Sequence, residues 1–119
     1  EGIKNKVPTG LVSHYLVKCM DRDYPATLSK KVISELREKL NFTGVVITDD
    51  LSMSAVNSYV ENGSAAVLAV NAGEDLIITS DFVKMYNSVY EAVKNKEIDM
   101  ETIDKAVRRN IAWKIAYDM

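Results

Sequence analysis

The sequence is poor in residues that build covalent and metal-bound sites, with one cysteine and one histidine among 119 residues. The single cysteine, Cys19, excludes an internal disulfide and a cysteine-rich zinc site, and we expect it to be a semi-buried loop thiol. No apolar run approaches the ~20 residues of a membrane-spanning helix. Fifteen Lys and Arg against seventeen Asp and Glu leave a net charge of -2. That balance gives no electrostatic reason to expect a nucleic acid or an anionic membrane as partner.

What the sequence does contain is a repeated pattern of short apolar strand, polar turn and amphipathic helix. Strands are predicted at residues 10–13, 45–48 and 75–79, and helices at residues 30–40, 52–60, 64–71, 82–94 and 100–116. The segment 45–48 is β-branched throughout and shows no alternation, which indicates a strand buried on both faces. Ser29 and Asp99 are expected to cap the helices that follow them, and Gly73 to end the helix before it.

The two C-terminal helices each carry a regular series of apolar residues. In the helix at 82–94 the spacing predicts one shared face for Phe82, Met85, Tyr86, Val89, Tyr90 and Val93. The apolar residues of the helix at 100–116 include Ile103, Ala106, Val107, Ile111 and Ile115. Trp113 lies on this last helix, far in sequence from any strand end, and is interpreted as a packing residue.

The strands recur at the spacing of βαβ units. Val12 and Val46 are 34 positions apart, and Val46 and Ile77 are 31 apart. Such units give parallel strands joined by right-handed crossovers. No glycine-serine linker divides the chain, so residues 1–119 are treated as one unit. Three βα units do not close a (β/α)8 barrel, so the pattern fits either a small open parallel sheet or part of a barrel.

Polar clusters stand at all three predicted strand ends. They are Ser13-His14, Thr48-Asp49-Asp50 and Thr79-Ser80-Asp81. Parallel sheets and barrels carry their functional groups at this edge. Adjacent residues that leave a strand point in different directions, so Asp49 and Asp50 cannot easily serve one point. A carboxylate here suits a nucleophile, a base or a metal ligand, while a purely structural role as turn or helix caps explains both equally well.

Several stretches resemble the family 3 glycoside hydrolases, in the order and spacing of the β-N-acetylglucosaminidase branch. They are residues 23–29 (DYPATLS), Leu36-Arg37 and residues 42–53 (FTGVVITDDLSM), with Val12-Ser13-His14 before them and residues 72–76 (AGEDL) after them. The similarity covers about residues 10–80. It implies that the chain is the last three βα units of a catalytic (β/α)8 barrel, an α/β fold with parallel strands. It also implies retaining hydrolysis of β-linked N-acetylglucosamine or related β-glycosides, often from cell-wall fragments.

The resemblance also assigns roles to individual residues. Asp49, which follows the small hydroxyl residue at the strand end, matches the family's catalytic nucleophile. Asp50 matches a variable position and is expected either to support the nucleophile without touching the substrate or to cap the turn. His14 resembles a histidine that lines the pocket, and Met53 is a candidate for contact with the sugar. Arg37 and Asp75 are expected to pair with neighbours at helix and strand ends.

Retaining hydrolysis needs a second group that protonates the leaving oxygen, and in this branch an Asp-His pair on an earlier loop supplies it. His14, the one histidine, matches a different motif. The resemblance therefore implies that the first five barrel strands lie outside this chain and that the chain alone is inactive or nearly so. Unpaired strand edges would favour self-association. The implied partner is a carbohydrate, with no cofactor and no metal, and the location of the parent protein stays open between cytoplasm and export.

Two alternatives remain open. One is a small doubly wound α/β binding domain in which Asp49 and Asp50 hold Mg2+. It explains the acidic pair and the parallel pattern, but not residues 23–29, and it leaves His14 without a role. The other is a catalytically inactive scaffold that keeps the barrel pattern only for packing, which the retention of Asp49 beside Thr48 argues against.

Overall fold

The computed structural model describes residues 2–60 and 64–119. The elements in chain order are β1 (Thr9–Val12), η1 (Ala26–Leu28), α1 (Lys30–Ser34), η2 (Glu35–Lys39), β2 (Val45–Thr48), α2 (Ser54–Asn57), α3 (Ala65–Ala72), α4 (Phe82–Lys94) and α5 (Met100–Ala116). The predicted bounds of the second strand and of the last two helices agree with β2, α4 and α5. The helix predicted at 52–60 is shorter in the structure, where α2 spans Ser54–Asn57. Within the described residues, no helix is both long and apolar enough to cross a bilayer.

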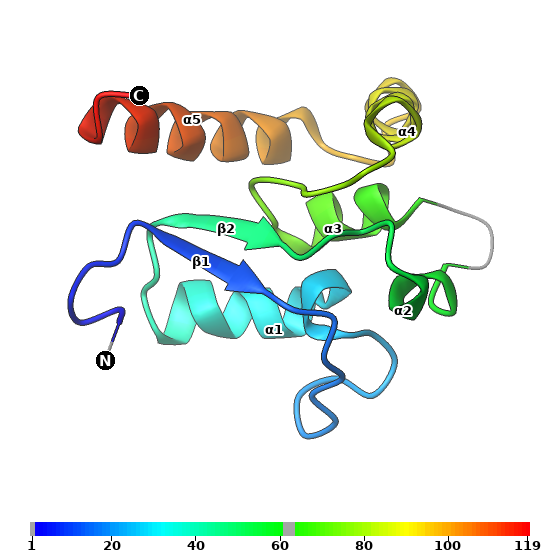
Figure 1. Cartoon of the computed structure of the whole chain (residues 1–119), viewed down its shortest axis with the longest axis horizontal. Coiled ribbons are helices and arrows are strands. Elements are labelled where there is room, and N and C mark those ends of the chain that lie inside the picture. Colours follow the sequence, from blue (N-terminus) through cyan, green and yellow to red (C-terminus); the bar gives the residue numbers. More distant parts are fainter. Residues whose placement is uncertain (1, 61–63) are drawn as a thin grey trace.

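β1 and β2 pair in parallel, as the repeat spacing predicts, with Gly10 opposite Val46 and Val12 opposite Thr48. Gly44 allows this close approach, since a Cβ at that position would stand 2.3 Å from the Pro8 carbonyl oxygen. β2 is the more buried strand, and Val46 and Thr48 have no exposed surface. Figure 1 shows the two strands between α1 on one side and α5 on the other.

The predicted third strand does not form a ladder. Residues 75–79 run beside β2, but the pairing is a single parallel bridge between Ile47 and Leu76. Side chains take two of the places that backbone groups would fill: the Val46 N–H donates to the Asp75 carboxylate, and the Ile78 N–H donates to the Thr48 hydroxyl. The segment is therefore extended and attached to β2 without regular strand pairing.

The helices begin and end where local chemistry predicts. The Ser29 hydroxyl accepts the Val32 N–H at the start of α1, and the Asp99 carboxylate accepts the Glu101 N–H at the start of α5. α1 continues directly into the wider π-helical turn η2, so the predicted helix at 30–40 is confirmed as one helical run. Gly73 ends α3 in the left-handed conformation, with φ of 111°.

The core consists of three clusters around α3 and β2. Val46 packs with Ile33 of α1 and Ala72 of α3. Residues before α3, among them Leu51 and Val56, pack with Ala66 and Ala69 on α3 and reach α4, while Val70, Ala92 and Ile98 join α3 to the last two helices. These contacts join α4 to α3, while α5 contacts both α3 and β2.

Several apolar side chains of α4 and α5 remain in solvent. The rings of Phe82, Tyr86 and Tyr90 stack along α4, with centroids 5.9 and 6.2 Å apart, and all three are exposed. Val107, Ile111 and Ile115 form a second exposed series on α5. The sequence spacing correctly predicts that these residues share a helix face. It does not predict whether another part of the protein covers that face. Cys19 is also exposed, so the prediction of a semi-buried thiol is wrong.

Candidate active site

The segments that follow β1 and β2 lie together at the C-terminal end of the two strands, and residues 76–80 lie beside them. The Asp49 N–H donates to the Val12 carbonyl at 3.0 Å, and the Leu51 N–H donates to the Ile78 carbonyl at 3.0 Å. These bonds extend the parallel arrangement beyond the strands themselves. They fix the turn at residues 49–53, where the sequence places its adjacent carboxylates.

Asp49 is the first residue after β2, and it is neither fully buried nor fully exposed. Its Oδ1 accepts the N–H of Asp50 at 2.8 Å, while its own N–H is held by Val12. The backbone at Asp49 is therefore anchored to the neighbouring strand. The second carboxylate oxygen has no hydrogen bond within the described residues.

Asp50 is used inside the turn. Its Oδ1 accepts the Ser52 N–H at 2.8 Å, which closes an Asx turn. The same hydrogen bond is the main reason why the pKa of Asp50 lies below its ordinary value, and the nearby His14 adds to it. The carboxylate of Asp50 is thus directed at the backbone.

The ring of His14 connects the end of β1 to the same turn. Its Nε2–H donates to the main-chain carbonyl of Asp50 at 2.9 Å. Its Nδ1 is buried and has no hydrogen-bond partner within the described part of the chain. Because donation to a carbonyl fixes the proton on Nε2, Nδ1 is the acceptor of the neutral ring. His14 and the Asp49–Asp50 turn, far apart in sequence, are brought together.

The outer part of the turn is polar and accessible. The N–H of Met53 donates to the Asp50 carbonyl, and its side chain is exposed. The Ser52 hydroxyl lies 2.9 Å from the Thr79 hydroxyl and accepts the Ser80 N–H at 3.1 Å. Sequence reasoning did not find this Ser52–Thr79 link. The available signal was the presence of hydroxyl residues after both strands.

The carboxylates at this edge do not gather into a metal site. Asp49 and Asp50 each accept a backbone N–H, and no group of three or more His, Cys, Asp or Glu ligands forms within residues 2–60 and 64–119. A doubly wound domain with Mg2+ held by Asp49 and Asp50 therefore finds no support in this geometry.

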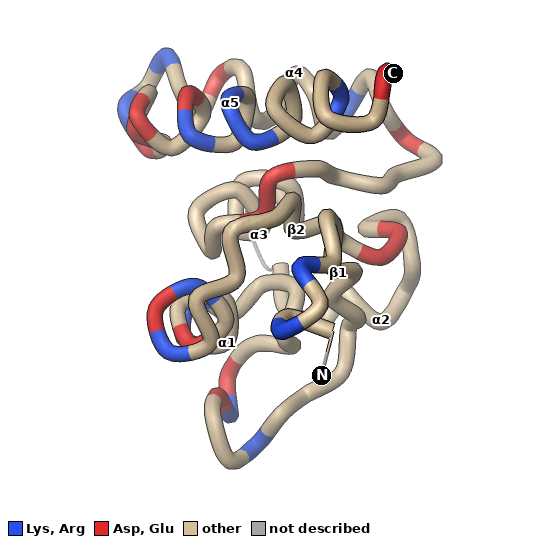
Figure 2. The backbone as a smooth tube through the Cα atoms, turned by 90° about the vertical axis from the view of Figure 1, so that its left-hand side faces the viewer, with Lys and Arg blue, Asp and Glu red and all other residues tan. Residues whose placement is uncertain are grey.

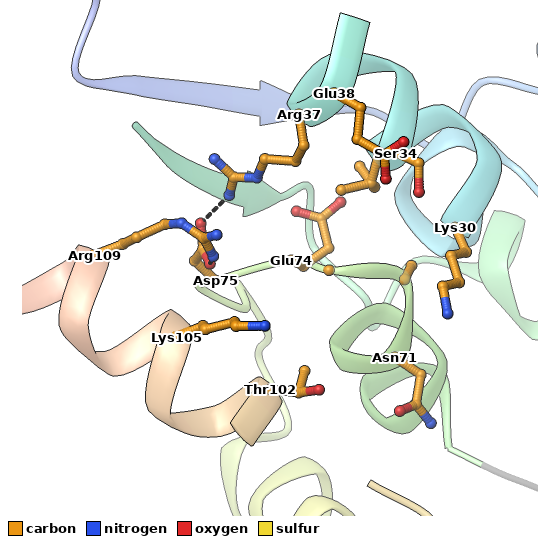
Figure 3. A pocket seen from close by; sticks show the side chains of 13 residues that line it. Lys30, Ser34, Arg37, Glu38, Asn71, Glu74, Asp75, Thr102, Lys105 and Arg109 are labelled. Atoms are coloured by element: carbon orange, nitrogen blue, oxygen red, sulfur yellow. Dashed lines mark hydrogen bonds and ion pairs between the residues drawn. The ribbon is translucent and has the colours of Figure 1, made fainter. Parts of the chain in front are cut away.

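A second polar cluster lies at the opposite ends of the strands. The Asp75 side chain is almost fully buried and forms ion pairs with Arg37 of η2 and Arg109 of α5. Its Oδ2 also accepts the Val46 N–H at 2.9 Å. The prediction that Arg37 and Asp75 pair with neighbours is confirmed, and Arg109, which the sequence did not single out, completes the cluster. Figure 3 shows both arginines converging on Asp75.

Glu74, the neighbour of Asp75, is buried at 2% exposure, and neither carboxylate oxygen has a hydrogen-bond partner among the described residues. Burial, and then the adjacent charge of Asp75, raise the pKa of Glu74 to about 8. The folded protein therefore holds a proton on Glu74 at neutral pH.

This proton predicts a pH dependence of stability. Because the folded pKa of about 8 lies above the ordinary value of 4.5, the folded state binds the proton more tightly than the unfolded state. The free energy of unfolding should be highest below pH 4.5 as far as Glu74 is concerned and should fall between pH 5 and pH 8, by up to about 1.4 kcal/mol for each pH unit. In the Glu74→Gln variant, the free energy of unfolding measured by urea titration should change less between pH 5 and pH 8. An unchanged slope in the variant would assign the dependence to other groups.

The glycosyl hydrolase family 3 N terminal domain matches residues 1–112. An uncharacterized secreted glycosyl hydrolase of Arthroderma benhamiae is 30% identical over 113 residues, which cover 90% of this chain and 32% of that protein. A β-hexosaminidase of Methylococcus capsulatus is 29% identical over 71% of this chain and 25% of its own length.

Solved structures of family 3 enzymes are also similar to this chain. A family 3 β-N-acetylglucosaminidase from Paenibacillus sp. superposes with a TM-score of 0.87 at 33% identity, over 98% of this chain and 24% of that one. A β-N-acetylhexosaminidase from Beutenbergia cavernae gives a TM-score of 0.85 at 30% identity, over 95% of this chain and 35% of that one. The chain thus spans about a third or less of the length of these relatives.

Proposed function

Because the chain belongs to glycosyl hydrolase family 3, we propose that it is part of the catalytic (β/α)8 barrel of a retaining glycoside hydrolase, with Asp49 as nucleophile. The substrate class is β-linked N-acetylglucosamine or a related β-glycoside, which is the class named for the Paenibacillus and Beutenbergia proteins. One observation carries the proposal: Asp49 directly follows a buried parallel strand, at the edge where barrels hold their catalytic groups.

The chemistry assigned to Asp49 is nucleophilic attack. Its carboxylate oxygen forms a bond to the anomeric carbon while the glycosidic bond breaks and the leaving oxygen takes a proton from an acid. The deprotonated acid then takes a proton from water, whose oxygen bonds to the anomeric carbon while the bond to Asp49 breaks, and the sugar leaves with retained configuration. A half-buried carboxylate with one oxygen unengaged and its backbone anchored to Val12 supports this role.

Asp50 and His14 hold the nucleophile turn in place in this proposal. Asp50 contributes through its turn and through its carbonyl, which accepts the His14 N–H. His14 is partly exposed and is proposed to line the sugar pocket, while its buried Nδ1 does not face the substrate directly. Met53, exposed on the same turn, is proposed to contact the sugar.

The acid/base group is assigned to a part of the barrel outside residues 1–119. Carboxyl groups of a retaining pair stand ~5–5.5 Å apart across the scissile bond. Asp50, the carboxylate nearest in sequence, is engaged by the Ser52 N–H and carries a lowered pKa, which is unfavourable for a proton donor. The proposed domain is therefore the last three βα units, completed by further βα units.

The surface of the chain supports this arrangement. A compact monomer of 13.3 kDa is expected to expose about 6,500 Å². This chain exposes 7845 Å². The excess of about 1,300 Å² exceeds the ~800 Å² that one partner buries in a standard interface. It includes Leu11 on β1, and the aromatic series on α4, both of which further βα units would cover.

The same open surface predicts self-association of the isolated chain. We expect light scattering after size exclusion to give a molecular mass that rises with protein concentration, because exposed strand edges and apolar faces pair. A single monomeric mass over a hundredfold range of concentration would contradict this expectation.

Hydrolysis of an aryl β-N-acetylglucosaminide by the purified chain tests the assignment of the acid/base group. We expect no turnover above the Asp49→Ala control, because one half of the catalytic pair is supplied from elsewhere. Turnover that disappears in Asp49→Ala would mean that both groups lie within these residues.

A further inference from the structure

A cavity of about 230 Å³ opens beside the Asp75 cluster, at the opposite ends of the strands from Asp49. It lies between α1 with η2, the end of α3, and α5 (Figure 3). Pockets that enclose drug-sized ligands usually measure ~300–1,000 Å³. This cavity is therefore of the size for a small ion or a small molecule rather than for an oligosaccharide.

The walls of the cavity are positively charged in a chain whose net charge is -2. Four basic residues line it, Lys30, Arg37, Lys105 and Arg109, against the acidic residues Glu38, Glu74 and Asp75. With Glu74 holding a proton, the lining carries two more positive than negative charges. Figure 2 shows where the Lys and Arg residues of α1 and α5 lie along the chain.

The basic groups differ in how much of their hydrogen-bonding capacity is used. Arg37 donates to the carbonyls of Phe42 and Gly44 and to Asp75, which uses three of its five N–H donors. Arg109 donates to Asp75 through Nη1, and its other N–H groups have no partner within the described residues. Lys30 on α1 and Lys105 on α5 line opposite walls (Figure 3), and the Lys105 ammonium also forms an ion pair with Glu101 at 2.8 Å.

Glu74 is the second indication of a ligand. It lines the cavity, is nine-tenths or more buried, and neither of its oxygens is bonded within the described part of the chain. Buried polar groups in folded proteins nearly always have a partner. A protonated carboxyl is a hydrogen-bond donor, and its nearby candidate acceptor among the described residues is the buried Thr27 hydroxyl, which lowers the pKa of Glu74 but forms no hydrogen bond of normal geometry with it. An ionised carboxylate would repel an anion.

We propose that this cavity binds the phosphate group of a small ligand, held by the ammonium groups of Lys30 and Lys105 and by the free N–H groups of Arg109. The Thr102 hydroxyl, on the wall formed by α5, provides a further donor. Phosphate fits this set because a tetrahedral oxyanion accepts charge-assisted hydrogen bonds from several directions at once. The site is separate from Asp49 and does not depend on glycosidase activity.

Binding is measured with inorganic phosphate and with glucose 6-phosphate, by isothermal titration and by the shift in melting temperature, against sodium chloride at equal ionic strength. We expect saturable stabilisation by phosphate beyond that of chloride. Tighter binding of the sugar phosphate would identify a phosphate ester as the ligand, and equal or tighter binding of inorganic phosphate the free ion. No stabilisation beyond the chloride control would overturn the proposal.

Charge-matched variants separate a site from general attraction. Lys30→Gln/Lys105→Gln should weaken phosphate binding at least about tenfold, because charge-assisted hydrogen bonds to the phosphate are lost. Lys84→Gln/Lys114→Gln removes the same charge away from the cavity lining and should leave binding unchanged. Equal weakening by both pairs would refute the site. Asp49→Ala should bind phosphate normally, so a failure here is distinguishable from a failure of the nucleophile assignment.

The role of Glu74 gives an independent readout. Sulfate keeps one charge state between pH 6 and pH 9, so its affinity reports the protein groups alone. We expect the affinity of the wild-type chain for sulfate to fall as pH rises through about 8, where Glu74 loses its proton. Glu74→Gln should bind sulfate with no such fall. A parallel fall in both proteins would contradict the contribution of Glu74 to the site.

Discussion

Asp49→Asn is expected to remove glycosidase activity from an assembled barrel by about 10⁴-fold or more, because an amide cannot form the glycosyl-enzyme ester. The assembled barrel is a chimera in which residues 1–119 replace the matching quarter of the Paenibacillus enzyme, whose structure covers 98% of this chain. The readout is kcat/KM for an aryl β-N-acetylglucosaminide.

Asp50→Asn is the matched control for this prediction. It changes the same charge one residue away, and it touches only the turn, since Asp50 accepts the Ser52 N–H. We expect a loss of no more than about tenfold, because Asn also forms Asx turns. A larger loss from Asp50→Asn than from Asp49→Asn would exchange the roles of the two carboxylates.

Asp75→Ala is expected to lower the free energy of unfolding by about 3–5 kcal/mol, the usual cost of breaking a buried ion pair. The substitution leaves Arg37 and Arg109 without their shared counter-charge and the Val46 N–H without its acceptor. Since small domains are stable by only ~5–15 kcal/mol, this loss is a large part of the total stability. Urea titration followed by circular dichroism measures the loss.

Asp104→Ala provides the comparison, because Asp104 is an exposed acidic residue on α5. Substitution of such a surface residue should change stability by no more than ~0.5 kcal/mol. If Asp75→Ala also stays below ~1 kcal/mol, the Arg37–Asp75–Arg109 cluster does not hold η2, β2 and α5 together as described.

The local sequence was sufficient to predict the bounds of β2 and α5. The β-branched run at residues 45–48 has no competing helical pattern, and β2 has these bounds. Asp99 as N-cap predicts the start of α5, and the apolar residues that follow it predict the length of the helix. Repeat spacing was enough to predict parallel pairing, because a βαβ connection of this length leaves few alternatives.

The third strand could not be judged from local sequence. Residues 75–79 have a strand-like composition, but whether a ladder forms depends on which acceptors reach the N–H groups. Thr48 and Asp75 provide side-chain acceptors at two positions, which hydrophobic patterning does not register. The exposure of Phe82, Tyr86 and Tyr90 is equally a property of what lies beside α4, not of its spacing.

The sequence selects candidate residues for the site, but it does not give the hydrogen bonds that the structure shows between them. The strand end and the resemblance to family 3 together pointed to Asp49, with His14 nearby. The hydrogen bond from His14 to the Asp50 carbonyl and the link between Ser52 and Thr79 join segments 27 or more residues apart. Such contacts depend on how whole βα units pack, so no local sequence pattern predicts them.

Identification of the residue that becomes glycosylated is the most direct test of the central claim. The chimera is treated with an activated fluorosugar analogue of N-acetylglucosamine, whose good leaving group needs no acid and whose fluorine slows hydrolysis of the covalent intermediate. Peptide mass spectrometry should then find the sugar esterified to Asp49, and the label should be absent from Asp49→Asn. A label on Asp50, or on any residue outside 1–119, would contradict the assignment of Asp49 as nucleophile.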